Sequence, residues 1–145
     1  MRRVLLAAAA LAIPISGVVV GFSSPAFAGK KVTITCKSLS GTETAAVLSE
    51  CTGGNTGGSS GALNLASGGT IDWVSGSTTT VGTPSAAFPS SKKCIKMYGA
   101  GSEAVAVKAA VSGDTGDGIK VPGTISGSVC INGGNVLPYK PVKIT

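Results

Sequence analysis

Histidine is absent from this chain of 145 residues, and arginine occurs only as Arg2 and Arg3. Without histidine, neither a Ser-His-Asp nor a Cys-His catalytic arrangement can form. With no arginine after residue 3, the bidentate clamps that arginine makes on phosphates and carboxylates are missing too. These absences exclude most common hydrolase designs. We therefore expect a protein that is not an enzyme and that uses no cofactor.

Closely spaced cysteines are also missing. The four cysteines are Cys36, Cys51, Cys94 and Cys130, and no two form a Cys-x-x-Cys motif. Zinc fingers, thioredoxin-type exchange and haem attachment therefore lose their sequence basis. In a small exported domain, which the N-terminal pattern described below indicates, an even number of cysteines predicts two disulfides. Of the three pairings, we expect Cys36 with Cys51 and Cys94 with Cys130, because a four-residue loop at residues 42–45 would place the first two opposite each other in a hairpin.

Charge is sparse, and it forms no long run. Ten basic and six acidic residues follow residue 28, which gives a net charge of +4. Because no basic stretch is interleaved with aromatic residues, we expect no nucleic-acid partner. The pairs Lys30-Lys31 and Lys92-Lys93 could instead meet an anionic wall polymer or a lipid surface.

The N-terminus has the three parts of a secretory signal peptide. Residues 1–3 are positively charged, residues 4–22 are apolar, and Ala26-Phe27-Ala28 is a cleavage motif of the Ala-x-Ala type. The apolar run barely reaches the roughly 20 residues that a membrane span needs, so a permanent anchor is only the alternative. We expect residues 1–28 to be a helical, cleaved signal peptide. Residues 29–145 should then form one domain, secreted or associated with the cell wall, with no stable membrane span.

The residues that are abundant favour strands. After residue 28, eighteen valines and isoleucines and fourteen threonines stand against five leucines, a mixture suited to pleated surfaces. Apolar residues alternate with polar ones over residues 32–36, 103–111 and 125–131, which predicts half-buried strands. Residues 70–81 indicate a hairpin with its turn at Ser75-Gly76-Ser77.

Short strands separated by turns predict an all-β, antiparallel fold around a single core. A β-sandwich stapled by two disulfides is the leading interpretation, and a small β-barrel is the alternative. Residues 52–69 are rich in glycine and serine, so we expect either a mobile loop or an interrupted edge strand there.

Several short motifs carry a resemblance. Ile34-Thr35-Cys36, Leu39-Ser40-Gly41-Thr42 and Leu48-Ser49-Glu50-Cys51-Thr52-Gly53 resemble a pattern found in short, uncharacterised secreted proteins of actinobacteria. The similarity continues through residues 71–76 and more loosely as far as Cys130. It implies secretion, a β-fold and paired cysteines, and it brings no activity, ligand or catalytic residue.

One motif suggests a catalytic site. Asp114-Thr115-Gly116 is the tripeptide of aspartic proteases, but those enzymes need two such aspartates and this chain has one copy. We interpret it, with Asp117-Gly118, as a hairpin turn between a strand that ends near Val111 and one that starts at Ile119. A weak calcium loop is the intermediate alternative. We expect the carboxylates to be solvated surface groups.

Aromatic residues are few, and only four follow residue 28. Trp73 lies within a predicted strand and should pack in the core. An exposed Trp73 beside Tyr98 or Tyr139 would instead make a platform for a sugar. The residues that we single out as candidate ligand contacts are Trp73, Tyr98, Asp114 and Asp117, and we assign no catalytic or metal-binding residue.

Two functional classes remain. The first is a non-catalytic secreted protein that binds an extracellular protein, a glycan or a small ligand through its loops or an open sheet face, or associates with the cell envelope. The second is a small secreted enzyme or inhibitor that uses Asp72, Asp114 and Asp117. A pocket lined by two or more of these aspartates would favour the second class, and their separation on turns would favour the first.

Overall fold

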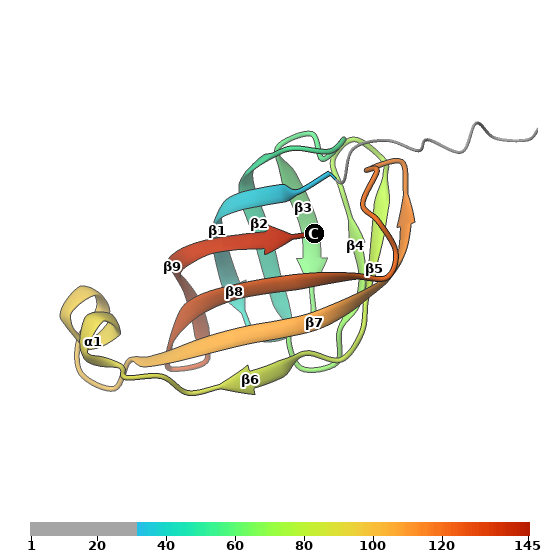
Figure 1. Cartoon of the computed structure of the whole chain (residues 1–145). Coiled ribbons are helices and arrows are strands. Elements are labelled where there is room, and N and C mark those ends of the chain that lie inside the picture. The colour runs from blue at the N-terminus through green and yellow to red at the C-terminus, as the bar shows by residue number, and fades with distance from the viewer. Residues whose placement is uncertain (1–31) are drawn as a thin grey trace, which may run out of the picture.

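The computed structural model describes residues 32–145 (Figure 1). The predicted signal peptide, residues 1–28, lies outside the described residues. The strands are β1 (Ile34–Thr42), β2 (Ala45–Thr52), β3 (Ser59–Leu63), β4 (Gly69–Asp72), β5 (Thr78–Val81), β6 (Ser85–Ala87), β7 (Glu103–Thr115), β8 (Gly123–Asn132) and β9 (Asn135–Ile144), and the helix α1 (Lys92–Tyr98) lies between β6 and β7.

The strands form one sheet that nearly closes on itself. Every pair is antiparallel, and the order is β3-β2-β1-β9-β8-β7-β5-β4, with β6 also paired to β7. The two outer strands meet through a bridge between Ser60 and Trp73. Figure 1 shows the resulting barrel-like curve. The all-β antiparallel prediction is confirmed, and of the two arrangements left open, the small barrel describes this single sheet.

Both predicted disulfides are present. Cys36 lies directly opposite Cys51 in the β1–β2 ladder, with the two Cα atoms 3.9 Å apart. The turn is tighter than the expected four-residue loop, because Thr42 still pairs with Ala45 and only two residues connect them. The predicted position of the turn nevertheless gives the correct strand register, and this register places Cys36 opposite Cys51.

The alternating apolar residues point into the barrel as expected. Ile34 and Cys36 of β1, Val105 and Val111 of β7, and Val129 of β8 are all buried in one continuous core. The hairpin predicted over residues 70–81 is also confirmed, since Asp72 pairs with Thr78. Residues 52–69 contain the edge strand β3, so the second of their two expected forms is the observed one.

The helix α1 was not predicted. Its residue Cys94 is fully buried in a small second cluster with Ala104 and Cys130, and the disulfide Cys94–Cys130 ties the helix to β8. The hydroxyl of Tyr98 donates to the carbonyl oxygen of Pro138 on β9 at 2.5 Å. Tertiary anchors therefore hold a helix that is too short to be stable by itself. Among residues 32–145, no helix has the length and apolar character that crossing a membrane requires.

We predict that the two disulfides contribute unequally to stability. Cys36–Cys51 spans 15 residues and Cys94–Cys130 spans 36, so the second restricts the unfolded chain more. Chain entropy gives about 3 kcal/mol for the first and about 4 kcal/mol for the second. Replacing each pair by alanine and measuring the free energy of unfolding in denaturant checks this. Equal losses, or a larger loss for Cys36–Cys51, would contradict the chain-entropy explanation.

Candidate functional site

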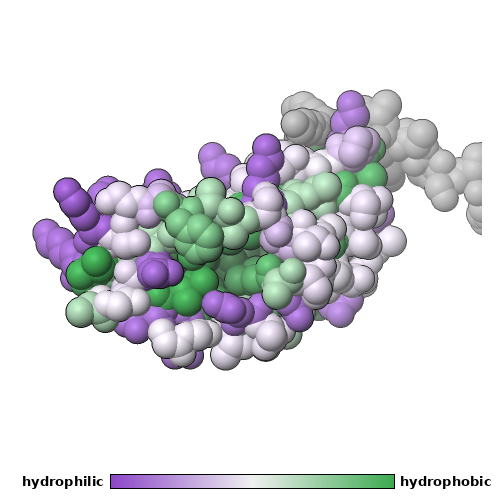
Figure 2. Space-filling model, turned by 90° about the horizontal axis from the view of Figure 1, so that it is seen from below, coloured by the Kyte–Doolittle hydropathy of each residue, from purple (hydrophilic) through white to green (hydrophobic). Residues whose placement is uncertain are grey.

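An apolar groove of about 240 Å³ lies on the side of the barrel where β6 runs along β7. The seam between β3 and β4 is closed by the Ser60–Trp73 bridge at one end only. Farther along, the β3–β4 connection and β6 leave an opening between them. Figure 2 looks at this side of the molecule and shows a hollowed apolar surface at its centre.

The floor of the groove is made by inward-facing side chains of β7 and β8. Val105 and Val129 pair across the two strands and are buried, while Val107 and Ile131 are half-buried. These residues belong to the alternating patterns that predicted strands. The groove is therefore an exposed part of the barrel interior and not a depression in its outer surface.

One wall of the groove is β6 with the residues on either side of it. Ala86 pairs with Val107, so its side chain lies on the groove side of the sheet. Pro84 and Phe88 complete this wall, and Phe88 is 73 % exposed. Ala87 does not line the groove, because successive side chains of a strand point to opposite faces. A large exposed aromatic side chain at the edge of an apolar groove is a feature that a ligand would cover.

The opposite wall is the β3–β4 connection, which its own hydrogen bonds shape. The amide of Leu65 donates to the carbonyl oxygen of Glu43 at 2.8 Å, which fixes this wall to the β1–β2 turn. The amide of Gly68 donates to Asn64, closing a turn around Ala66. Gly68 has a φ of +73°, and a Cβ there would lie 2.3 Å from the carbonyl oxygen of Gly82. Glycine is therefore required for the connection to lie this close to the chain after β5.

The charge of the groove is negative, although lysines outnumber carboxylates in the chain. Glu43 and Glu103 are its two charged lining residues, and both are exposed. Glu43 comes from the β1–β2 turn and Glu103 from the start of β7. The groove thus combines aliphatic walls with carboxylates at its rim.

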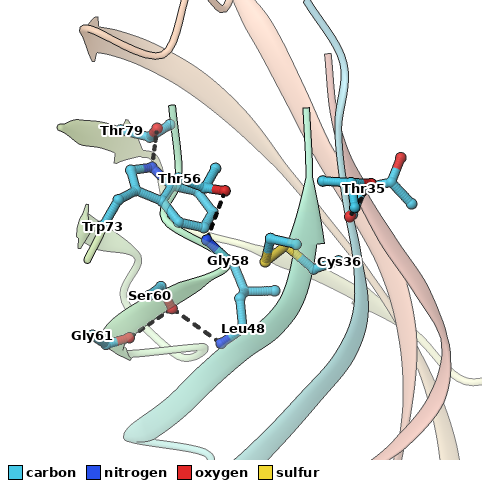
Figure 3. The surroundings of a disulfide bond; sticks show 11 residues. Thr35, Cys36, Leu48, Thr56, Gly58, Ser60, Gly61, Trp73 and Thr79 are labelled. Atoms are coloured by element: carbon cyan, nitrogen blue, oxygen red, sulfur yellow. Dashed lines mark hydrogen bonds between the residues drawn. A yellow bond between two sulfur atoms is a disulfide. The ribbon is translucent and has the colours of Figure 1, made fainter. Parts of the chain in front are cut away.

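The candidate contacts singled out from the sequence do not line this groove. Trp73 is 3 % exposed and belongs to the core together with Cys36 and Cys51, as predicted. Its indole nitrogen donates to the hydroxyl of Thr79 at 2.9 Å (Figure 3). The ring is therefore a buried structural element, and it forms no sugar-binding platform with Tyr98.

Asp117 is buried, so the expectation that it is a solvated surface group is wrong. It is 3 % exposed, and its two carboxylate oxygens accept hydrogen bonds from Ser77 Oγ at 2.6 Å and from Thr79 Oγ1 at 3.1 Å. Thr79 Oγ1 in turn accepts a hydrogen bond from the indole nitrogen of Trp73. Trp73, Thr79, Asp117 and Ser77 therefore form one continuous hydrogen-bonded network in the interior. The hydroxyls replace the water that a buried carboxylate loses.

Asp114 shapes the connection after β7. Its Oδ2 accepts from the amides of Gly118 at 3.0 Å and Ile119 at 3.2 Å, while its Oδ1 is buried without a partner. Burial raises the pKa of the Asp114 carboxyl, and the neighbouring charge of Asp117 raises it further. The predicted hairpin boundaries are wrong, because β7 continues past Val111 to residue 115 and β8 starts only at residue 123.

Tyr98 and Asp72 lie in different parts of the fold, on α1 and β4. Tyr98 is half-buried against β9 through its hydroxyl, and its carbonyl oxygen accepts from the side chain of Asn132. Asp72 is exposed on β4 and lies outside the groove. The structure therefore brings Asp114 and Asp117 together, but in a connection stabilised by internal hydrogen bonds. Residues 32–145 hold no cluster of three or more carboxylates and cysteines suited to a metal ion.

No protein-family model, curated protein or solved structure matches this chain.

We predict that Thr79→Val destabilises the protein by about 1–3 kcal/mol, because it leaves the indole nitrogen of Trp73 and one oxygen of Asp117 without a partner in the interior. Valine has nearly the same shape, so packing is preserved. Thr80→Val on the same strand is the matched control, since Thr80 is exposed. Denaturant unfolding measures both variants. A loss for Thr80→Val as large as that for Thr79→Val would contradict the role of the network.

We predict that Asp114→Asn raises the melting temperature at pH 7. The pKa of Asp114 is raised above its ordinary 3.8 in the fold, so the protonated form favours folding and this contribution is lost as pH rises through the folded-state pKa. Asparagine keeps an oxygen acceptor for Gly118 and Ile119. The gain should vanish below the ordinary carboxyl pKa. Asp72→Asn, on an exposed side chain, is the control with the same charge change, and an equal effect there would reject the explanation.

Proposed function

We propose that this protein is a non-catalytic, secreted binding protein that holds a small cationic amphiphile in the groove beside β6. The observation that carries the proposal is an open, aliphatic groove of about 240 Å³ with carboxylates as its only charged lining groups. An apolar cavity of about 150 Å³ accommodates one benzene ring, and pockets for drug-sized ligands begin at about 300 Å³. The groove therefore suits a short alkyl chain or a single ring.

The carboxylates at the rim favour a positive charge on that ligand. Glu43 comes from the β1–β2 turn and Glu103 from the start of β7, so a cationic group at the groove mouth lies near one or both of them. Because both side chains are exposed, each ion pair is worth about 0–1 kcal/mol. The apolar walls then supply most of the affinity, and the carboxylates discriminate between ligands of different charge.

The lining also supports binding over catalysis. A glycosidase needs two carboxylates across a cleft, and Glu43 and Glu103 are two carboxylates at one groove. However, the remaining lining residues are aliphatic apart from Phe88, and they offer no side-chain donors or acceptors for sugar hydroxyls. The alternative enzyme based on Asp72, Asp114 and Asp117 has no support from this groove, because none of the three lines it.

Secretion remains part of the proposal. Two disulfides suit a small protein that folds in an oxidising compartment. The signal-like pattern of residues 1–28 and the resemblance to secreted actinobacterial proteins point in the same direction.

Three probes with the same alkyl chain test the ligand class: octylammonium, octanol and octanoate, titrated by calorimetry. We expect the affinity to fall in that order, with about a fivefold step between octylammonium and octanol, equivalent to about 1 kcal/mol. Glu43→Gln combined with Glu103→Gln should remove this step, whereas Glu50→Gln, at an exposed carboxylate that pairs with Lys37, should preserve it. Binding of none of the probes would reject the proposal.

Two tryptophan variants of β6 test the location. Ala86→Trp places a large ring on the groove side and should weaken octylammonium binding at least about tenfold, because the ring occupies the groove. Ala87→Trp is the matched control, since Ala87 is the next exposed residue of the same strand and does not line the groove. Equal binding by both variants would place the ligand elsewhere. If the wild type sediments as a dimer and Ala86→Trp as a monomer, the groove binds a second copy and the proposal fails.

A further inference from the structure

The helix α1 projects from one end of the barrel, at the far left of Figure 1. Cys94 and Tyr98 lie one helical turn apart and face the barrel, where the disulfide to Cys130 and the hydrogen bond to Pro138 hold them. Since the attachment uses only this side of the helix, the rest of its surface is presented outward.

The outward surface is strongly basic. Lys92, Lys93 and Lys96 are all exposed, and Lys92 and Lys96 lie on the side opposite Cys94 by helical geometry. No acidic residue occurs between Asp72 and Glu103 in the sequence. Within residues 32–145, the ion pair is Lys37 with Glu50, so these three lysines form none there. None of the three lysines is therefore neutralised by a direct ion pair within these residues.

Apolar side chains flank these lysines. Ile95 is 47 % exposed and Met97 is 54 % exposed, on the two sides of the helix between the lysines and the barrel. Single exposed apolar residues are common on soluble proteins. Two of them beside three unpaired lysines, on an element that projects from the molecule, have the composition of a surface that inserts shallowly into a membrane interface.

We propose that α1 docks on an anionic lipid membrane, with its lysines at the lipid phosphates and with Ile95 and Met97, on the two flanks of the lysines, packed against the lipid headgroups. The charge complementarity requires an anionic partner. The exposed aliphatic side chains favour a lipid surface over a soluble polyanion, because only the lipid surface removes them from water. This docking is independent of the groove. It would hold the protein weakly and reversibly at the envelope, since seven residues bury little apolar area.

Vesicle sedimentation with the exported protein, purified from culture medium, tests the docking. Vesicles of phosphatidylcholine with one-quarter phosphatidylglycerol should bind at least about tenfold more tightly than pure phosphatidylcholine vesicles, because each lysine near an anionic surface contributes about 1 kcal/mol. Replacing Lys92, Lys93 and Lys96 by glutamine should abolish the difference. Replacing Lys120, Lys140 and Lys143 by glutamine makes the same change in net charge and should preserve it. Equal losses for the two triple variants would overturn the proposal.

A second variant distinguishes docking on a lipid surface from binding to a soluble polyanion. Ile95→Ser combined with Met97→Ser keeps all three lysines and should weaken binding to the anionic vesicles several-fold, while leaving binding to soluble polyphosphate unchanged. If the double variant binds the vesicles as tightly as the wild type, the partner is a polyanion recognised by charge alone and lipid docking is rejected. Circular dichroism checks that each variant retains the β-fold.

Discussion

The closure of one sheet at a single seam organises this protein. The outer strands β3 and β4 lie side by side, and the bridge between Ser60 and Trp73, the residue after β4, joins them, with a further hydrogen bond from the amide of Val74 to the carbonyl oxygen of Ser59 at 3.1 Å. The hydroxyl of Ser60 accepts from the amide of Leu48 at 3.0 Å and donates to the carbonyl oxygen of Gly61 at 2.8 Å (Figure 3). The hydroxyl bonds of Ser60 hold β3 in place next to β2, and the bridge and the Val74–Ser59 bond close the seam at one end. The other end is open beside β6, where the groove lies.

Polar side chains stabilise the closed end of the seam, and aliphatic side chains line the open end. At the closed end, Trp73, Thr79 and Asp117 satisfy one another inside the protein, and a carboxylate that looked like a functional group serves the fold. At the open end, Val107 and Ile131 belong to core-like patterns but are half-buried along the groove. Polar residues therefore stabilise the closed end of the barrel, whereas aliphatic residues form the exposed surface of the groove.

Polar residues are buried here and residues from core-like patterns line the groove, so only part of the structure could be predicted from the sequence. Strands β1, β7 and β8 were predictable because a period of two is a local property, and the Cys36–Cys51 disulfide followed from a turn only a few residues away. Asp117 could not be recognised as buried, since its partner Ser77 lies 40 residues earlier in the chain. Likewise, α1 has no periodic apolar face and depends on a disulfide to a strand formed 36 residues later.

The groove was unpredictable for a related reason. It exists because β6 takes the place beside β7 after β5 ends, and β7 is its only partner strand within residues 32–145. In this part of the chain, no strand therefore closes the barrel between β6 and the β3–β4 connection, and the inner face of β7 is open near Val107. No local pattern predicts this, because each short run of residues is consistent with an ordinary strand.

Charge distribution follows from the same topology. A net charge of +4 after residue 28 suggests a mildly basic molecule with no particular partner. The fold separates the charges, because the β1–β2 turn and the start of β7 bring two carboxylates to the groove, while α1 gathers three lysines on an element without acidic neighbours in sequence. Few charges are therefore enough to give two surfaces of opposite sign. Neither surface is visible in the average composition.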